Sequence, residues 1–128
     1  MTAAEYLAEV KSMIIGSPQI IGLTVLREML EGDELGLYRY RLSLQDESLL
    51  EMFERFEVQA NQIVITKYSF HWQNSDGTLR QRWDNARHHP ELPTYPHHVH
   101  DQAETAVKAH PAVTAKDILA FIMARLKT

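Results

Sequence analysis

The chain of 128 residues contains no cysteine. Disulfide bonds, thiolate metal sites and cysteine nucleophiles are therefore excluded, and a cytoplasmic location is the default expectation. No run of about 18 apolar residues is present, so we expect no membrane-spanning helix. The N-terminus also lacks a basic segment followed by an apolar run, and we therefore expect no secretory signal.

Acidic residues outnumber basic ones, and the formal net charge is −4 at pH 7. This balance argues against a general nucleic-acid coat protein. The charge is unevenly distributed, because residues 1–64 carry 11 acidic and 5 basic side chains whereas residues 65–128 carry 6 and 8. All seven histidines lie in the second half. The second half could therefore present a locally cationic surface to a polyanion, although the uneven distribution is equally consistent with chance.

Two segments have the apolar spacing and the capping residues of helices. Thr2 and Glu5 match a capping box, in which a hydroxyl at the N-cap and a carboxylate at N3 each accept a backbone N–H. The apolar residues that follow recur at helical spacing, which predicts a helix over 2–15 that ends at Gly16-Ser17-Pro18. The same kind of pattern predicts a C-terminal helix over 114–126.

Residues 19–84 change to the period-two alternation of β-strands, most clearly over 35–44. Residues 49–58 also fit a helical period, and we interpret them as a strand because short turns precede and follow them. These patterns predict a single α+β domain, 1–128, with a four- to five-stranded antiparallel β-meander packed against the N-terminal and C-terminal helices. Residues 101–110 are expected to form one or two turns of helix.

Histidine and proline are concentrated in one segment, 85–100, which we expect to be a loop. It contains five of the seven histidines and three of the five prolines. Prolines at this spacing forbid a continuous helix or a central strand, and they bias the preceding residues toward extended conformations. Such a segment is stiff without being regular. Because imidazole titrates near neutral pH, the loop suggests proton transfer, metal binding or phosphate binding.

The loop and the strands before it carry the groups that metal-free RNA cleavage needs. That reaction requires a base for the 2′-hydroxyl proton, an acid for the leaving 5′ oxygen and cations around the phosphorane. Histidine suits the first two roles, arginine suits the third, and aromatic rings can stack on bases. The candidate catalytic residues are His88, His89, His97, His98, His100, Asp84 and Arg82. The candidate substrate-binding residues are Arg80, Arg87, Trp83, Tyr95 and His71.

A metal site is the main chemical alternative. In an extended segment His98 and His100 project to the same side, and a carboxylate from Asp84, Glu91 or Asp101 would complete a two-histidine, one-carboxylate site. The spacing matches neither a zinc finger nor a His-Glu-x-x-His helix. We therefore expect adventitious binding of nickel or zinc more than a specific site, and we assign no metal ligand and no cofactor.

Several candidates also have purely structural explanations. Trp72 and Trp83 are expected to pack in the core of the sheet. Asp84 and Asn85 could simply form an Asx-turn where their strand ends. His71 is equally consistent with a solvated residue and with a member of the site.

The segments that carry these residues resemble the TumE family. They are Tyr38-Arg39-Tyr40-Arg41-Leu42, Lys67-Tyr68-Ser69-Phe70-His71-Trp72-Gln73, Asp76-Gly77, Arg82-Trp83-Asp84-Asn85-Ala86, His88-His89-Pro90-Glu91-Leu92 and Tyr95-Pro96-His97-His98-Val99-His100. The likeness covers about half the chain, roughly 35–100. Arg87 and Tyr95 depart from the family pattern, in which proline and phenylalanine are frequent at these places.

TumE proteins are small bacterial and archaeal proteins grouped as toxins of type II toxin–antitoxin pairs. The resemblance implies a toxin that inhibits growth through RNA or translation and is neutralised by an adjacent helix-turn-helix antitoxin. It assigns no residue roles.

Three functional hypotheses follow. The leading one is a toxin-like endoribonuclease, independent of metal, or an RNA-binding inhibitor. The second is a non-enzymatic module that docks a partner, and the third is a metal-dependent hydrolase or metal sensor. Because a meander leaves two unpaired edges, we also expect a homodimer or an edge covered by the antitoxin.

Overall fold

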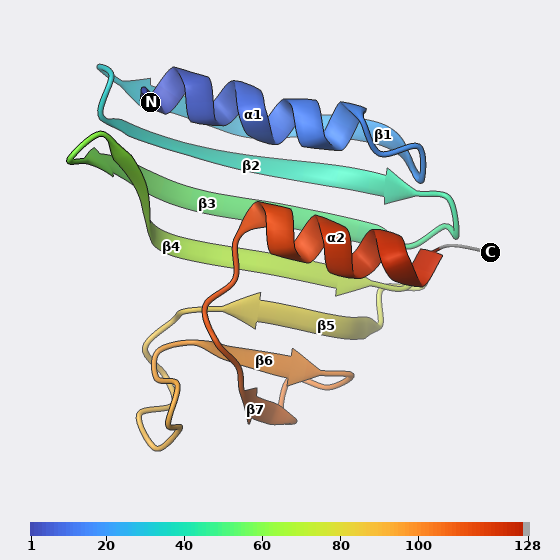
Figure 1. Cartoon of the computed structure of the whole chain (residues 1–128). Helices are drawn as coiled ribbons and strands as arrows, with labels where there is room; N and C mark the ends of the chain where they lie inside the picture. Colours follow the sequence, from blue (N-terminus) through green and yellow to red (C-terminus); the bar gives the residue numbers. More distant parts are fainter. Residues whose placement is uncertain (127–128) are drawn as a thin grey trace.

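The computed structural model describes residues 1–126, with a helix near each end of this range (Figure 1). Helix α1 (Ala3–Ile15) begins at the predicted capping box. The Thr2 N–H donates to Glu5 Oε1 over 3.0 Å, and the Glu5 N–H donates to Thr2 Oγ1 over 3.1 Å. Helix α2 (Ala115–Leu126) begins with a similar cap. Each helix starts where a side chain satisfies a backbone N–H that helical geometry leaves free.

The helices have 13 and 12 residues. Neither reaches the length and apolarity that a helical crossing of a lipid bilayer requires.

Between the helices, seven strands form one sheet in which each strand pairs antiparallel with the next one along the chain. The strands are β1 (Ile20–Glu31), β2 (Leu35–Leu44), β3 (Leu49–Gln59), β4 (Gln62–Gln73), β5 (Leu79–Asp84), β6 (His98–Asp101) and β7 (Val107–Ala109). The α+β class, the antiparallel sheet, the two flanking helices and the strand over 49–58 are confirmed. The predicted strand number is wrong, because the sheet has seven strands and not four to five.

The two additional strands arise where a loop and helical turns were predicted. Strand β6 occupies the end of the segment 85–100, and β7 lies within 101–110. With four and three residues, these strands are too short to show a period of their own. They are defined by pairing with a neighbouring strand, which is a non-local interaction that a reading of local sequence does not detect.

The sheet has one covered face and one open face. Both helices lie against the same face, where they enclose the core (Figure 1). A row of paired residues from four strands, Met52, Phe70, Trp83 and Val99, is buried there. Because side chains alternate along a strand, the next row points to the opposite side, which we call the open face. That row consists of Arg41, Glu51, His71, Arg82 and His100.

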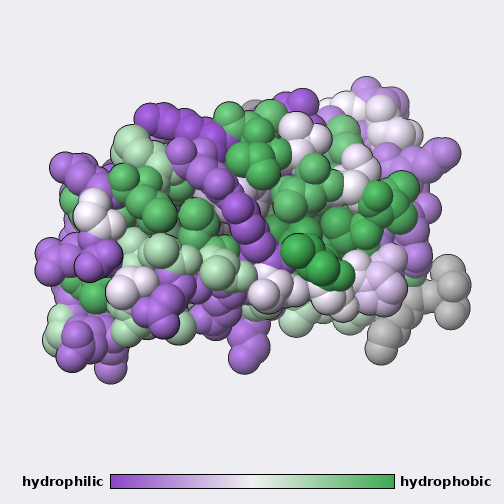
Figure 2. Space-filling model, turned by 90° about the horizontal axis from the view of Figure 1, so that it is seen from above, coloured by the Kyte–Doolittle hydropathy of each residue, from purple (hydrophilic) through white to green (hydrophobic). Residues whose placement is uncertain are grey.

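The edge of the sheet formed by β1 is apolar. Large hydrophobic side chains are exposed along β1 and at the end of α1, a surface that we call the β1 edge. They are Ile15, Ile21, Leu23, Val25, Leu26, Met29 and Leu30. Figure 2 looks onto this side of the molecule and shows hydrophobic side chains gathered on it. A gathering of exposed apolar side chains of this kind often marks an interaction site.

Candidate functional site

Strands β5 and β6 bring a carboxylate, a guanidinium and two imidazoles together on the open face. Antiparallel pairing sets Asp84 directly opposite His98, and Arg82 directly opposite His100. Directly opposed residues of an antiparallel pair point to the same face of a sheet. The register of one strand pair therefore assembles all four side chains.

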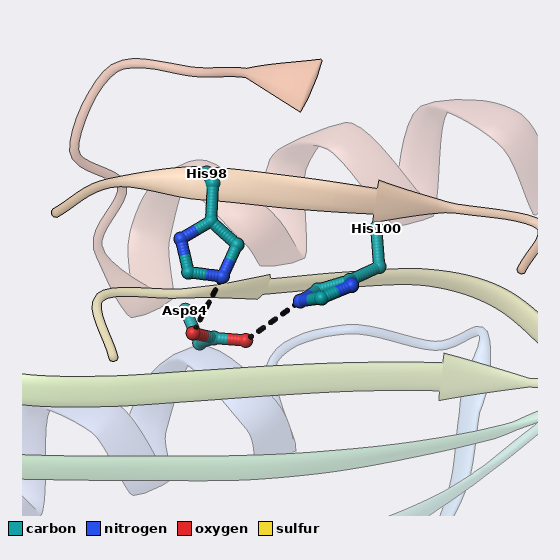
Figure 3. Close-up of side chains that lie close together, drawn as sticks. All are labelled: Asp84, His98 and His100. Carbon is teal, nitrogen blue, oxygen red and sulfur yellow. Dashed lines mark ion pairs between the residues drawn. The ribbon is translucent and has the colours of Figure 1, made fainter. Parts of the chain in front are cut away.

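Asp84 is the centre of this group (Figure 3). Its Oδ1 lies 2.9 Å from His98 Nε2, and its Oδ2 lies 3.5 Å from His100 Nε2. The Ala86 N–H donates to Oδ1 over 3.0 Å, and Arg82 Nε–H donates to Oδ2 over 3.2 Å. The exposed fractions of Asp84, His98 and His100 are only 7%, 2% and 6%. A buried carboxylate is thus held by a backbone group and three side chains.

The other nitrogen of each imidazole is also engaged. His98 Nδ1 lies 2.9 Å from the Pro96 carbonyl oxygen, and His100 Nδ1 lies 2.9 Å from the Glu104 carbonyl oxygen. A carbonyl oxygen can only accept a hydrogen bond, so each Nδ1 carries a proton. In a neutral ring Nε2 then has a free lone pair, and in both rings that nitrogen faces Asp84.

The charge of Arg82 is shared between two carboxylates. Besides its bond to Asp84, Arg82 donates from both terminal nitrogens to the two carboxylate oxygens of Glu104. These hydrogen bonds lower the pKa of Glu104. Bidentate pairing fixes the guanidinium in one orientation, so Arg82 and Glu104 together brace one side of Asp84.

The buried group forms the floor of a cleft of about 620 Å³ on the open face. Lys67 and Ser69 of β4 line one side, and His88 and His89 of the loop between β5 and β6 line the other. The His89 ring lies edge-on to His98, with centroids 5.1 Å apart. Its Nδ1 lies 3.3 Å from Glu91 Oε1. The loop therefore adds two less buried imidazoles above the two buried ones.

A second hollow adjoins the cleft and shares Ser69 and Arg82 with it. His71 lies in this hollow, beside Arg41 and Glu51. Glu51 accepts hydrogen bonds from Arg41 over 3.1 Å and from Arg39 over 3.0 Å. The arginines of this part of the open face are thus paired with a carboxylate of the neighbouring strand.

A family model described as Toxin TumE matches residues 13–126. The chain belongs to the TumE toxin family. The match extends the resemblance seen over 35–100 to the C-terminal helix and to the end of α1. Comparisons with curated proteins and with solved structures gave no match. Membership of a toxin family indicates the toxin component of a toxin–antitoxin pair, and hence an antitoxin partner.

In this TumE protein, six of the sequence-predicted site residues surround one cleft. They are Arg82, Asp84, His88, His89, His98 and His100. His97 points elsewhere: its ring stacks on Tyr68, whose hydroxyl lies 2.9 Å from His97 Nδ1. Burial lowers the pKa of His97. His97 lines a separate hollow beside Arg87.

Other predicted residues are also distributed away from the cleft. Trp83 is 2% exposed and packs edge-on against Phe121 of α2, as the structural alternative anticipated. Arg80 pairs with Asp46 over 2.9 Å. Tyr95 is 40% exposed in the loop. The cleft is thus lined by histidines and by residues of β4, and these three predicted residues do not line it.

Sequence reasoning did not nominate Lys67, Ser69 or Glu104. The first two share a face of β4 with His71, so the alternation of that strand contained the signal. Nothing comparable pointed to Glu104, because it reaches Arg82 only through the hairpin between β6 and β7.

Proposed function

We propose that this toxin acts on RNA, which binds in the cleft lined by Lys67, His88 and His89. One observation supports this proposal above all. Basic side chains line the mouth of a cleft whose floor is the buried group of Asp84 and two imidazoles. No ion pair engages Lys67 within residues 1–126. Arg87 lines the neighbouring hollow, which also contains Lys67 and His88. A cationic rim of this kind favours the phosphates of a polyanion.

The two less buried imidazoles, His88 and His89, suit proton transfer better than the two buried ones. Both ring nitrogens of His98 and of His100 are already engaged, so these rings position other groups. His89 uses Nδ1 toward Glu91, which leaves Nε2 available to a bound ribose hydroxyl or leaving oxygen. Lys67 would then stabilise the charge that develops on the phosphate.

The experiment is cleavage of a mixed RNA by the purified chain, together with growth inhibition when the chain is produced without its antitoxin. The substitution His89→Ala is expected to lower the cleavage rate by about 10²-fold or more, which is the usual contribution of a general acid or base. His110→Ala is the matched control, because His110 is a histidine outside the cleft lining. Cleavage and toxicity that are unchanged in His89→Ala, or lost equally in His110→Ala, would refute the proposal.

A non-enzymatic role in association is favoured by one observation, the β1 edge. We propose that two copies of the chain pair through β1, antiparallel to each other. Strand β1 has 12 residues and no proline or lysine, the residues that commonly protect an edge strand. A second β1 offers a strand of equal length with the same apolar side chains. The cleft lies toward the opposite edge and would stay accessible in such a pair.

A further inference from the structure

Three electron-rich atoms converge in a buried place on the floor of the cleft. Each Nδ1 of His98 and His100 donates its proton to a backbone carbonyl, so neutral rings turn the lone pair of Nε2 toward Asp84. Lone pairs facing a carboxylate repel it unless a cation lies between them. A metal ion is one cation that would fit there, because it can bind all three atoms at once.

A single divalent ion suits the groups already assembled there. The two rings lie with centroids 4.9 Å apart and are 2% and 6% exposed, and Arg82 donates to the same carboxylate. One ion between the three donor groups would engage both rings and the carboxylate at once in a poorly solvated place.

We propose that Asp84, His98 and His100 bind a divalent first-row transition-metal ion. The nitrogen and oxygen atoms that the three residues offer lie within 4.8 Å of one another. Two donors on a metal with bonds of about 2.1 Å lie roughly 3.0 Å apart at a right angle and roughly 3.4 Å apart at the tetrahedral angle. The observed separations are close to this spacing, with 2.9 Å from Asp84 Oδ1 to His98 Nε2 and 3.5 Å from Asp84 Oδ2 to His100 Nε2.

The surrounding hydrogen bonds are those of a metal centre. A metal-bound histidine typically donates its other N–H to a backbone carbonyl or a carboxylate, which fixes the tautomer and the ring orientation. Both rings meet this condition. The carboxylate of Asp84 is oriented by the Ala86 N–H and by Arg82, whose own charge Glu104 offsets. These hydrogen bonds hold the three donor groups in a fixed orientation.

The donor set also restricts the choice of metal. Two imidazoles and one carboxylate suit zinc, cobalt(II), nickel(II), iron(II) or manganese(II), whereas calcium and magnesium prefer oxygen ligands. Three protein ligands leave coordination positions open, as in catalytic and not structural sites. The cleft lined by Lys67 and His89 adjoins these positions. Metal binding requires no RNA, so it stands independently of the proposed substrate.

The test is titration of the full chain with Co2+ after treatment with a chelator and removal of the chelator. We expect about one Co2+ per chain with visible d–d absorption, and Zn2+ that displaces it. His98→Gln and Asp84→Asn are expected to weaken binding by about a hundredfold or more, whereas His110→Ala leaves it unchanged. Failure of the wild type to bind Co2+ would overturn the proposal. So would binding by His98→Gln that equals the wild type, since this would identify adventitious binding by surface histidines.

A measurement on the wild type covers the case in which those variants do not fold. In 15N-correlated spectra of the histidine rings, Zn2+ is expected to shift Nε2 of two histidines whose Nδ1 stays protonated. Shifts confined to rings without this tautomer would overturn the proposal. Co2+ binding without RNA cleavage would refute the proposed function alone, and RNA cleavage by a chain that binds no Co2+ would refute the metal site alone.

Discussion

A buried glutamate in the core leads us to predict how the free energy of unfolding depends on pH. Glu54 of β3 is 0% exposed, and its Oε1 accepts hydrogen bonds of 2.7 Å from the hydroxyls of Tyr6 and Tyr38. Its Oε2 has no hydrogen-bond partner within the described part of the chain. Burial raises the pKa of Glu54, and the hydrogen bonds from the two tyrosines lower it by less. The carboxyl therefore holds its proton more tightly in the folded chain than in the unfolded one.

The sign of the pH dependence follows from this shift. A carboxyl whose folded pKa is raised contributes stability that is fully present below its unfolded pKa, near 4.5. That contribution is lost as the pH rises through the folded pKa. Each unit of upward shift lowers the wild-type free energy of unfolding by about 1.4 kcal/mol between the acidic and the alkaline limit. Glu54→Gln removes this titration while it keeps an acceptor for Tyr6 and Tyr38.

We expect Glu54→Gln to gain stability relative to the wild type as the pH rises from 5 to 8. At pH 5 the two proteins should differ by about 1 kcal/mol or less, because the neutral amide resembles the protonated acid. Glu54→Ala should instead be about 3 kcal/mol less stable than Glu54→Gln at both pH values, because neither variant titrates there and two tyrosine hydroxyls lose their acceptor. Urea unfolding of all three proteins at both pH values gives the comparison. Parallel pH profiles for Glu54→Gln and the wild type would refute the reasoning, because both would then titrate alike.

Two further predictions concern packing and association. Gly36→Ala is expected to destabilise the fold by about 1–3 kcal/mol in urea unfolding, because the added Cβ would lie 2.6 Å from Phe56 Cζ. A loss below about 0.5 kcal/mol would contradict this close approach of Phe56 to Gly36. Leu26→Lys is expected to convert a dimer into a monomer in sedimentation equilibrium. Val64→Lys, at an exposed apolar residue on β4, is expected to leave the dimer intact. A monomeric wild type that binds its antitoxin through β1 would instead assign the β1 edge to that partner.

Local sequence patterns predicted the elements that carry their own signal. The alternation of β2 runs from Tyr38 to Leu44, and the capping box of α1 involves Thr2 and Glu5 alone, so neither depends on distant contacts. Strands β6 and β7 have no such signal. Val99 is the only apolar residue of β6, between two histidines, and the strand exists because β5 supplies its hydrogen bonds.

The sequence predicts candidate site residues, but it does not predict which of them contact one another. The sequence placed His98 and His100 on one side and left three carboxylates open as their partner. Pairing with β5 brings Asp84 to both rings, whereas Glu91 lies against His89 and Asp101 pairs with Lys108 over 2.9 Å. Strand register thus decides which of the three carboxylates contacts the two imidazoles, and the amino-acid sequence alone does not specify that register.

That register couples the site to the core. Successive side chains of β6 point to opposite faces of the sheet, so a slip of one residue would turn His98 and His100 toward the helices and bring Val99 to the open face. Val99 is 5% exposed and lies directly opposite Trp83 in the covered row, so burial of one small apolar side chain opposes the slip. The same contact that completes the core therefore holds both imidazoles over Asp84. Loss of packing at Val99 should therefore disturb the site and the fold together, even though Val99 does not line the cleft.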